Sequence, residues 1–221
     1  MRLTVYECTR PFAAVALRFL CSYEHSNRKR KLPDGPLIVV SNHLSWLDIP
    51  LIGLGIPRQI AFIAKKEYFH SPFHRRLVDL YGGFTVDRGA VDGTALKKAF
   101  EILDQGGCLG IFPEGTRSKT FQLQQGHVGT AFIALHKNVY ILPIGIYGTE
   151  KIRHKFESIT HILYRPKVVV NIGEPFKLPD VHGHPTRRDR EVGTEIIMRK
   201  IAELLPESYR GVYRDNADHE S

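Results

Sequence analysis

The hydrophobic pattern of the chain alternates between two kinds of segment. Short runs of apolar and β-branched residues are typical of buried strands, and apolar residues repeated every three or four positions are typical of helices. The clearest helix extends from Ala95 to Leu103; Asp92 is suited to cap its start, and Gly106 and Gly107 to end it. The whole pattern predicts strands at residues 37–40, 59–64, 84–86, 108–112, 140–147 and 167–172, and helices up to about residue 26 and at residues 49–54, 95–103, 127–136 and 192–205.

This order of elements predicts the fold class. Strands that alternate with helices are typical of a mainly parallel sheet with helices on both faces. The segments between the predicted elements are too short to divide the core into domains. We therefore expect an α/β fold: a single domain with a mainly parallel central sheet flanked by helices, preceded by an N-terminal helical segment that associates with a membrane.

The amino-acid composition narrows the class of partner. Lys and Arg number 31 and Asp and Glu 23, so the 221-residue chain has a formal net charge of +8 at pH 7. A basic balance favours nucleic acid, an anionic membrane surface or a phosphorylated substrate. The three cysteines, Cys8, Cys21 and Cys108, are odd in number and too far apart for a CxxC metal site, which favours a reducing compartment.

The N-terminal segment is apolar but short. Its longest apolar run, residues 11–21, is interrupted by Arg18, whereas a membrane span needs about 18 apolar residues. Four basic residues follow at positions 28–31. A short apolar helix beside a basic run is typical of a protein that lies on an anionic membrane surface. We expect no full membrane span and no secretion; a solvated linker and a nuclear signal are the alternative interpretations of the basic run.

The segment Asn42–Asp48 is the first candidate for chemistry, because it directly follows a predicted strand. Ligands of open α/β sheets bind at the carboxyl ends of the strands. A histidine at that edge is able to act as a general base, because an imidazole has an unperturbed pKa of about 6.5. A carboxylate is able to hold the tautomer of this imidazole and stabilise its protonated form. His43 and Asp48 are therefore the candidate acid–base pair.

This pair requires a particular local structure. Residues five apart on one helix are roughly 140° apart around its axis, so His43 must lie on a loop and Asp48 at the start of the next helix. Pro50 supports this arrangement, since proline is tolerated in a first helical turn. The alternative interpretation is structural: Asp48 is an N-cap or the acidic member of a capping box with Ser45, and His43 is a hydrogen-bonded loop residue. We expect Trp46 to anchor the loop by packing, and contact with the substrate is the alternative interpretation.

Three further segments carry candidate functional residues. Residues 112–118, Phe-Pro-Glu-Gly-Thr-Arg-Ser, follow another predicted strand, and Arg117 is able to bind a phosphate with Thr116 and backbone N–H groups as further donors. Arg88 follows a short predicted strand and is a second candidate anion ligand; the alternative for both arginines is a solvated turn. Pro143 interrupts an apolar run and predicts a bulge or an edge. An acid–base pair and two arginines at three strand ends indicate an anionic substrate that gives up a proton, such as a phosphorylated alcohol.

These blocks resemble those of the glycerolipid acyltransferases, specifically the 1-acylglycerol-3-phosphate (lysophosphatidic acid) acyltransferase type. That family carries four ordered blocks, and the resemblance covers about residues 36 to 178. All four occur here in order: Asn-His-x-x-x-x-Asp (the HX4D motif) at 42–48, a Gly-rich Phe-x-x-x-Arg block at 83–88, Phe-Pro-Glu-Gly-Thr-Arg-Ser at 112–118, and Leu-Pro-Ile at 142–144.

The resemblance implies a reaction and a set of roles. His43 removes the proton from the free hydroxyl of a lysophospholipid acceptor, and Asp48 orients His43. The hydroxyl attacks the thioester carbonyl of acyl-CoA or acyl carrier protein, with no covalent acyl-enzyme, no metal and no cofactor. The resemblance assigns the acceptor phosphate to Arg88, Glu114, Gly115, Thr116, Arg117 and Lys65, with Lys66 as an alternative to Lys65, and the acyl-donor side to Pro143.

The resemblance also implies an organisation and a location. We expect an N-terminal amphipathic and basic segment at residues 1–31, an acyltransferase core at residues 32–182, and a C-terminal helix and polar tail at residues 183–221. Members of the family often carry clearer N-terminal membrane helices. Here the short apolar segment favours peripheral attachment to the cytoplasmic face of a membrane, through residues 5–21 and 28–31.

Three alternatives remain open. The acceptor is another lysolipid or glycerol-3-phosphate, since relatives use the same blocks for these substrates. Alternatively, the protein is an acyl thioesterase, in which water replaces the alcohol at the His43–Asp48 base, although water needs no phosphate site. A non-enzymatic phosphate- or nucleic-acid-binding domain also fits the charge, but the basic residues are scattered outside 28–31 and no nucleic-acid-binding motif is recognisable. We therefore expect no nucleic-acid partner.

Overall fold

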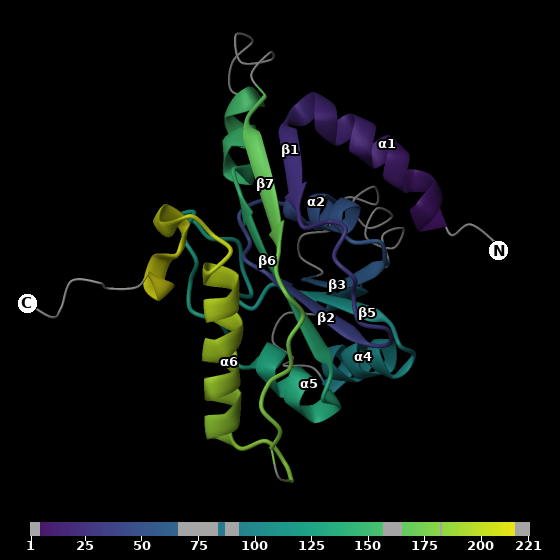
Figure 1. Ribbon diagram of the computed structural model, residues 1–221, viewed down its shortest axis with the longest axis vertical. Coiled ribbons are helices and arrows are strands. Elements are labelled where there is room, and N and C mark those ends of the chain that lie inside the picture. The colour runs from purple at the N-terminus through teal and green to yellow at the C-terminus, as the bar shows by residue number, and fades with distance from the viewer. Residues whose placement is uncertain (1–4, 66–83, 87–92, 157–164, 182, 215–221) are drawn as a thin grey trace, which may run out of the picture.

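The computed structural model describes residues 5–65, 84–86, 93–156, 165–181 and 183–214 of the chain. Their strands form one seven-stranded sheet in the order β1-β7-β6-β2-β5-β3-β4 (Figure 1). The strands are β1 (Ser22–Ser26), β2 (Leu37–Ser41), β3 (Ile60–Lys65), β4 (Phe84–Val86), β5 (Cys108–Ile111), β6 (Tyr140–Tyr147) and β7 (Lys167–Ile172). The helices are α1 (Val5–Leu20), α2 (Asp48–Gly55), α4 (Gly93–Asp104), α5 (Gly129–Lys137) and α6 (Arg187–Ala202).

The sheet is mainly parallel, as predicted. Strands β6, β2, β5, β3 and β4 all run in the same direction. Strand β7 is antiparallel to β6, and the edge strand β1 is parallel to β7. The carboxyl ends of β2 and β5 therefore meet at one edge, which is the edge that ligands use in open α/β sheets.

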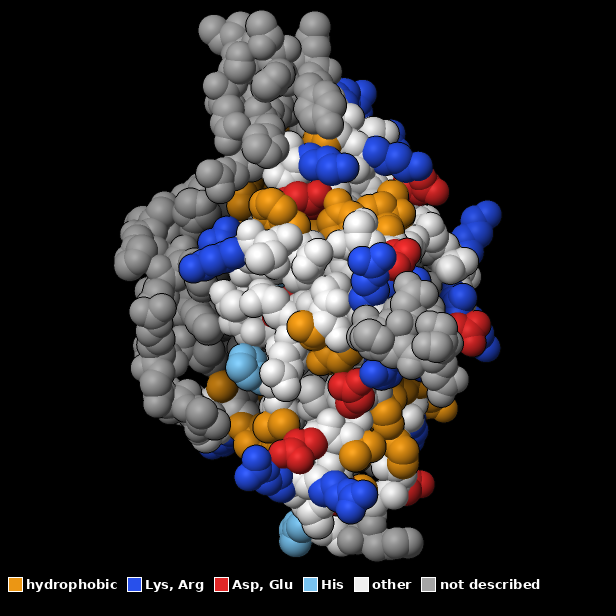
Figure 2. Space-filling view, turned by 90° about the vertical axis from the view of Figure 1, so that its left-hand side faces the viewer, with side chains coloured by type: hydrophobic (Ala, Val, Ile, Leu, Met, Phe, Trp, Pro, Cys, Tyr) orange, Lys and Arg blue, Asp and Glu red, His pale blue; other side chains and the backbone are white. Residues whose placement is uncertain are grey.

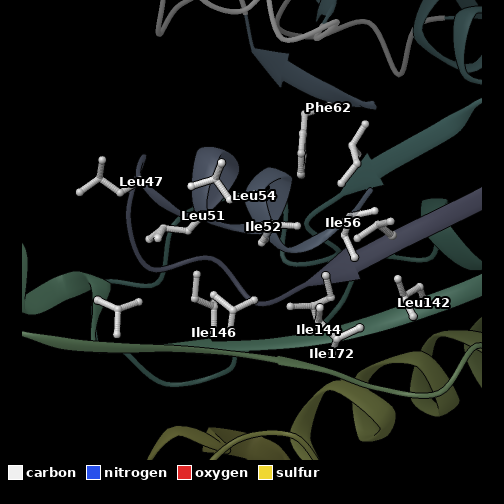
Figure 3. Close-up of a cluster of buried hydrophobic side chains, with 14 of the residues drawn as sticks. Leu47, Leu51, Ile52, Leu54, Ile56, Phe62, Leu142, Ile144, Ile146 and Ile172 are labelled. Atoms are coloured by element: carbon white, nitrogen blue, oxygen red, sulfur yellow. The ribbon is translucent and has the colours of Figure 1, made fainter. Parts of the chain in front are cut away.

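Helices cover both faces of the sheet. Helices α1 and α2 pack on one face, where α2 covers a cluster of leucine and isoleucine side chains from β2, β6 and β7 (Figure 3). Helices α4, α5 and α6 pack on the other face and share a second apolar cluster with β2, β5 and β6. Strand β2 is buried along its whole length, because it lies at the centre of the sheet between these two layers. The predicted single α/β domain is confirmed.

Local signals explain where the helices start and stop. Helix α4 ends before Gly106, which has a left-handed φ of +72°, as expected; Asp92, the predicted cap, lies outside the described residues. Helix α5 ends at Lys137, before Asn138, which is also left-handed (φ +44°). Helix α6 begins five residues earlier than predicted, because Thr186 and Asp189 form a capping box that precedes its apolar residues.

The N-terminal segment differs from the prediction. Helix α1 ends at Leu20, and Ser22–Ser26 form β1, so the expectation of helix up to about residue 26 is wrong. Strand β1 has no apolar run, and its conformation follows from pairing with β7 along the edge of the sheet. Among the described helices, none is both long and apolar enough to cross a membrane.

Pro143 lies in a central strand, and the bulge that it predicts is present. Strand β6 pairs with β7 from Ile144 onward, and Ile141 forms an isolated bridge to Phe176. Between these two pairs, the segment that follows β7 has one residue more than β6. The bulge therefore lies opposite the proline, which has no N–H to donate.

Candidate active site

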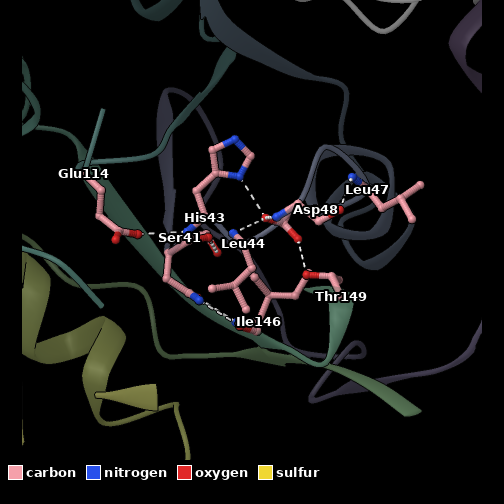
Figure 4. A network of polar contacts seen from close by, with 10 residues as sticks. Ser41, His43, Leu44, Leu47, Asp48, Glu114, Ile146 and Thr149 are labelled. Atoms are coloured by element: carbon pink, nitrogen blue, oxygen red, sulfur yellow. Dashed lines mark hydrogen bonds and ion pairs between the residues drawn. The ribbon is translucent and has the colours of Figure 1, made fainter. Parts of the chain in front are cut away.

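The loop after β2 has the local structure that the acid–base pair requires. Residues 42–47 form an irregular turn, and α2 begins at Asp48. His43 therefore lies on the loop and Asp48 in the first helical turn, as predicted. The Nδ1 atom of His43 lies 2.8 Å from Asp48 Oδ2 (Figure 4).

The carboxylate of Asp48 is fully buried and accepts four hydrogen bonds. Its Oδ2 accepts from His43 Nδ1 and from the backbone N–H groups of Leu44 (2.7 Å) and Ser45 (2.8 Å). Its Oδ1 accepts from the hydroxyl of Thr149 at 2.7 Å. Asp48 thus organises the turn as a capping residue would, and it also binds the imidazole.

The β5–α5 loop holds His43 from the other side. The backbone N–H of His43 donates to Glu114 Oε1 at 2.9 Å, and its carbonyl accepts from the N–H of Ser118 at 2.8 Å. The imidazole stacks on Phe112, with ring centroids 3.9 Å apart and planes 11° from parallel. The side chain of His43 remains 15% exposed, and its second ring nitrogen points away from Asp48 (Figure 4).

Glu114 is buried and bound to the backbone of two loops. Its Oε2 accepts from the N–H of Gln124 at 2.9 Å, while Oε1 binds His43. Burial raises the pKa of Glu114 to about 7; the nearby charge of Asp48 adds to this, and the two N–H donors oppose it. The carboxylate therefore ties the β5–α5 loop to the histidine loop.

The other predicted phosphate ligands that the structure describes lie at the same edge of the sheet. Gly115, Thr116 and Arg117 are exposed on the loop after β5, and Gly115 has a left-handed φ of +66° that turns the chain there. Lys65 is the last residue of β3. The side chain of Lys65, together with Lys66 and Arg88, lies outside the described residues. Pro143 is buried in β6 in register with Val40 and is not part of this group.

Three residues shape the site that sequence reasoning did not single out. Asn42 is buried and bridges to the backbone of Ile146, with both bonds 2.8 Å long. Thr149 and Phe112 contact the carboxylate and the imidazole of the pair. Asn42 and Phe112 belong to two of the recognised blocks, whereas Thr149 lies in none of them. The expectation that Trp46 packs is wrong, because its side chain is 62% exposed.

This geometry supports proton transfer. A histidine with Nδ1–H bound to a buried carboxylate presents its other nitrogen as a base. Across the described part of the chain, no group of three or more His, Cys, Asp and Glu side chains is placed to hold a metal ion.

The comparisons with known proteins identify the family of this chain. The sequence profile described as Acyltransferase matches residues 23–147, which is more than half of the chain. The chain belongs to the acyltransferase family. The matched region of the chain extends from β1 to the end of β6, and it includes the His43 loop and the 112–118 loop.

Two relatives illustrate the similarity, one over most of this chain and one over about half of it. The chain is 29% identical over 199 residues to the 1-acyl-sn-glycerol-3-phosphate acyltransferase of Bacillus subtilis, which covers 87% of this chain and 95% of that protein. It is 34% identical over 115 residues to the lyso-ornithine lipid O-acyltransferase of Pseudomonas aeruginosa, which covers 52% of this chain and 44% of that protein.

A solved structure shows the same fold. The crystal structure of the 1-acyl-sn-glycerophosphate (LPA) acyltransferase PlsC from Thermotoga maritima matches with a TM-score of 0.68 at 28% identity, over 90% of this chain and 79% of that chain. The predicted family and the predicted class of enzyme are confirmed.

Proposed function

We propose that this acyltransferase moves a fatty acyl group from a thioester donor to the free hydroxyl of 1-acylglycerol-3-phosphate, giving phosphatidic acid for phospholipid synthesis. The observation that carries the proposal is the 2.8 Å contact between His43 and a buried Asp48 at the edge where the strands end. The names of the Bacillus subtilis relative and of the Thermotoga maritima structure support this choice of acceptor.

The reaction uses His43 as the base and then as the acid. The second ring nitrogen of His43 takes the proton of the acceptor hydroxyl as its oxygen bonds to the thioester carbonyl carbon. Asp48 holds the imidazole and stabilises the imidazolium that forms. The tetrahedral intermediate then expels the sulfur, which leaves as a thiol with the proton from His43.

In our proposal, basic and hydroxyl side chains from the recognised blocks, together with Lys65, bind the acceptor phosphate. The ligands are Arg88, Lys65, Arg117, Thr116 and the backbone of Gly115, and Glu114 serves the site by holding their loop. A guanidinium suits a phosphate because it donates two parallel hydrogen bonds. The acyl chain and thioester approach from the side of Pro143, delivered by acyl-CoA or acyl carrier protein.

A second acceptor is favoured by one observation. The similarity to a lyso-ornithine lipid O-acyltransferase supports an aminolipid acceptor in place of a phosphate-bearing one. The two candidates differ in charge, because only 1-acylglycerol-3-phosphate presents a phosphate monoester to Arg117.

The decisive experiment measures thiol release from palmitoyl-CoA by the purified protein, with and without each acceptor, and identifies the lipid product. We expect release that depends on 1-acylglycerol-3-phosphate and is matched by phosphatidic acid. His43→Ala is expected to lower kcat at least about 100-fold, since a general base contributes 100-fold or more. His136→Ala, which changes an exposed histidine on α5, is the matched control and is expected to keep wild-type activity.

Each alternative gives a different result in this assay. Release of free fatty acid without acceptor would identify a thioesterase. Turnover with lyso-ornithine lipid alone would move the function to the aminolipid acceptor. If palmitoyl-CoA is inert, the same assay is repeated with palmitoyl-acyl carrier protein, and inactivity with both donors and both acceptors would overturn the proposal.

We also infer peripheral attachment to an anionic membrane surface, on the cytoplasmic face. An apolar stripe along α1 supports this inference, because all of its residues are exposed to solvent: Cys8, Pro11, Phe12, Val15, Ala16 and Phe19. Phe12 and Phe19 are 77% and 73% exposed. The basic residues 28–31 add electrostatic attraction to anionic lipids.

A further inference from the structure

The carboxylate of Asp48 is held on two sides. Its Oδ2 faces the imidazole and two backbone N–H groups. Its Oδ1 faces away from the imidazole and accepts the hydroxyl of Thr149 at 2.7 Å (Figure 4). Asp48 and Thr149 are both buried, so water does not compete for this bond.

Thr149 reaches the site from a distant part of the chain. It lies 101 residues after Asp48, directly beyond β6 and Gly148, and it starts the 3-10 segment η2 (Thr149–Phe156). The family match ends at residue 147, and Thr149 belongs to none of the four sequence blocks.

The backbone around Thr149 is anchored independently of Asp48. Gly148 has a φ of +91°, and a Cβ there would lie 2.2 Å from the carbonyl oxygen of Lys167, so this tight turn requires glycine. Glu150 accepts the N–H of Gly148 at 3.0 Å and the hydroxyl of Tyr209 at 2.7 Å. Tyr209 belongs to the C-terminal 3-10 turn η4 (Glu207–Tyr209). The position of the Thr149 hydroxyl is therefore set by neighbours on both sides of it.

This anchoring matters because the side chain of Asp48 does not fix the plane of its own carboxylate. The terminal torsion of an aspartate is broad and nearly two-fold. A hydrogen bond to Oδ1 restricts that torsion, and it keeps Oδ2 in line with Nδ1 of His43. Without the hydroxyl, a buried carboxylate oxygen loses its donor, which is unfavourable and lets the carboxylate rotate toward other donors.

We propose that Thr149 is a positioning residue for the acyl-transfer reaction: its hydroxyl sets the orientation of Asp48 and, through Asp48, of the His43 imidazole. This proposal rests on the proposed function, which assigns His43 and Asp48 as the catalytic pair. Thr149 does not touch the substrate.

The test compares two buried threonines. Thr149→Val preserves the shape of the side chain and removes its hydroxyl. Thr194→Val is the matched control, because the buried Thr194 hydroxyl donates a bond of the same length, 2.7 Å, to the carbonyl of Arg190 on α6. For each variant, kcat, the KM of the acceptor and the unfolding midpoint are measured.

We expect kcat of Thr149→Val to fall about tenfold or more, with the KM of the acceptor within about twofold of wild type. Thr149→Ser, which keeps the hydroxyl, is expected to recover most of kcat, and Thr194→Val to retain it. A Thr149→Ser variant that is folded and as slow as Thr149→Val would overturn the proposal, because the hydroxyl would then not be the cause.

A second measurement does not depend on turnover. In protein labelled with 15N-histidine, the His43 signals are identified by their absence in His43→Ala. We expect the wild type to show the tautomer with the proton on Nδ1, and Thr149→Val to show a smaller share of it. A change in tautomer with no acyl transfer by the wild type would leave the positioning role intact and reject the proposed substrates. If the wild type is active, and Thr149→Val shows the same kcat and the same tautomer as Thr194→Val, the positioning role alone is rejected.

Discussion

At the scale of single residues, Asp48 shows that a structural and a chemical interpretation of one carboxylate do not exclude each other. A carboxylate offers about four lone-pair sites. Asp48 accepts hydrogen bonds from two backbone N–H groups that shape the turn, from the hydroxyl of Thr149, and from Nδ1 of His43, the proposed base. The same bonds that form the turn therefore aim the imidazole.

Glu114 predicts a pH dependence of stability. Burial raises its pKa to about 7 in the folded protein from an ordinary value of 4.5. Between these two pH values the folded chain keeps a proton that the unfolded chain releases. The contribution of Glu114 to the free energy of unfolding is therefore complete below pH 4.5 and is lost as the pH rises through 7. This loss lowers the free energy of unfolding by about 3 kcal/mol.

Urea denaturation of wild type and Glu114→Gln below pH 4.5 and above pH 7 measures this contribution. We expect the loss of stability with rising pH to be smaller in Glu114→Gln than in wild type. Glu174→Gln, which changes an exposed glutamate, is the control and is expected to behave like wild type. Equal pH dependence in all three proteins would mean that Glu114 titrates near its ordinary pKa.

At the scale of the elements, Asn42 continues the pairing of β2 with β6 past the last residue of β2. Its side-chain amide donates to the carbonyl of Ile146 and accepts from the N–H of the same residue, both at 2.8 Å. This pair of bonds imitates one step of a strand ladder. It fixes the start of the loop immediately before His43.

Asn42→Ala is therefore expected to be strongly destabilising. It leaves a buried N–H and a buried C=O of Ile146 without their partner, at about 1–3 kcal/mol each. We expect the free energy of unfolding to fall by about 2–5 kcal/mol, together with kcat. The control is Asn171→Ala, which removes one bond, from Asn171 to the carbonyl of Leu204. An equal loss of stability in the two variants would contradict this account of Asn42.

At the scale of the whole molecule, two helices present very different surfaces to solvent. The exposed residues of α6 form ion pairs such as Arg187–Glu191, and basic and acidic side chains are interspersed on the face that carries α6 (Figure 2). The exposed stripe of α1 consists of apolar side chains instead, among them Phe12 and Phe19. The contrast favours contact of α1 with an apolar phase and solvation of α6.

The double substitution Phe12→Ser and Phe19→Ser tests the apolar stripe. Both rings are mostly exposed, so we expect the free energy of unfolding to stay within about 0.5 kcal/mol of wild type. Binding to vesicles that contain phosphatidylglycerol is expected to fall at least about tenfold, because each ring transfers apolar area into the lipid. Val192→Ser on α6 is the control, since Val192 is also exposed. Unchanged co-sedimentation of the double variant would reject attachment through α1.

The sequence predicted the elements whose own residues specify them. The buried runs of β2, β5, β6 and β7 and the periodic face of α4 carry their hydrophobic pattern locally, and each lies within a few residues of its predicted position. Strand β1 was missed because its residues Ser22–Ser26 have no apolar alternation, and their extended conformation depends on a neighbour 145 residues later in the chain.

The same distinction applies to the site. The sequence by itself determined the ordered blocks and therefore the family. It also predicted the candidate acid–base pair and the strand ends that carry it, because these are local patterns of residue type and spacing. Only the tertiary structure decided that Glu114 binds the backbone of His43, that Phe112 stacks on the imidazole and that Thr149 closes the far side of Asp48. These contacts join residues about 70 to 100 positions apart, and the parallel order of β5, β2 and β6 brings them together.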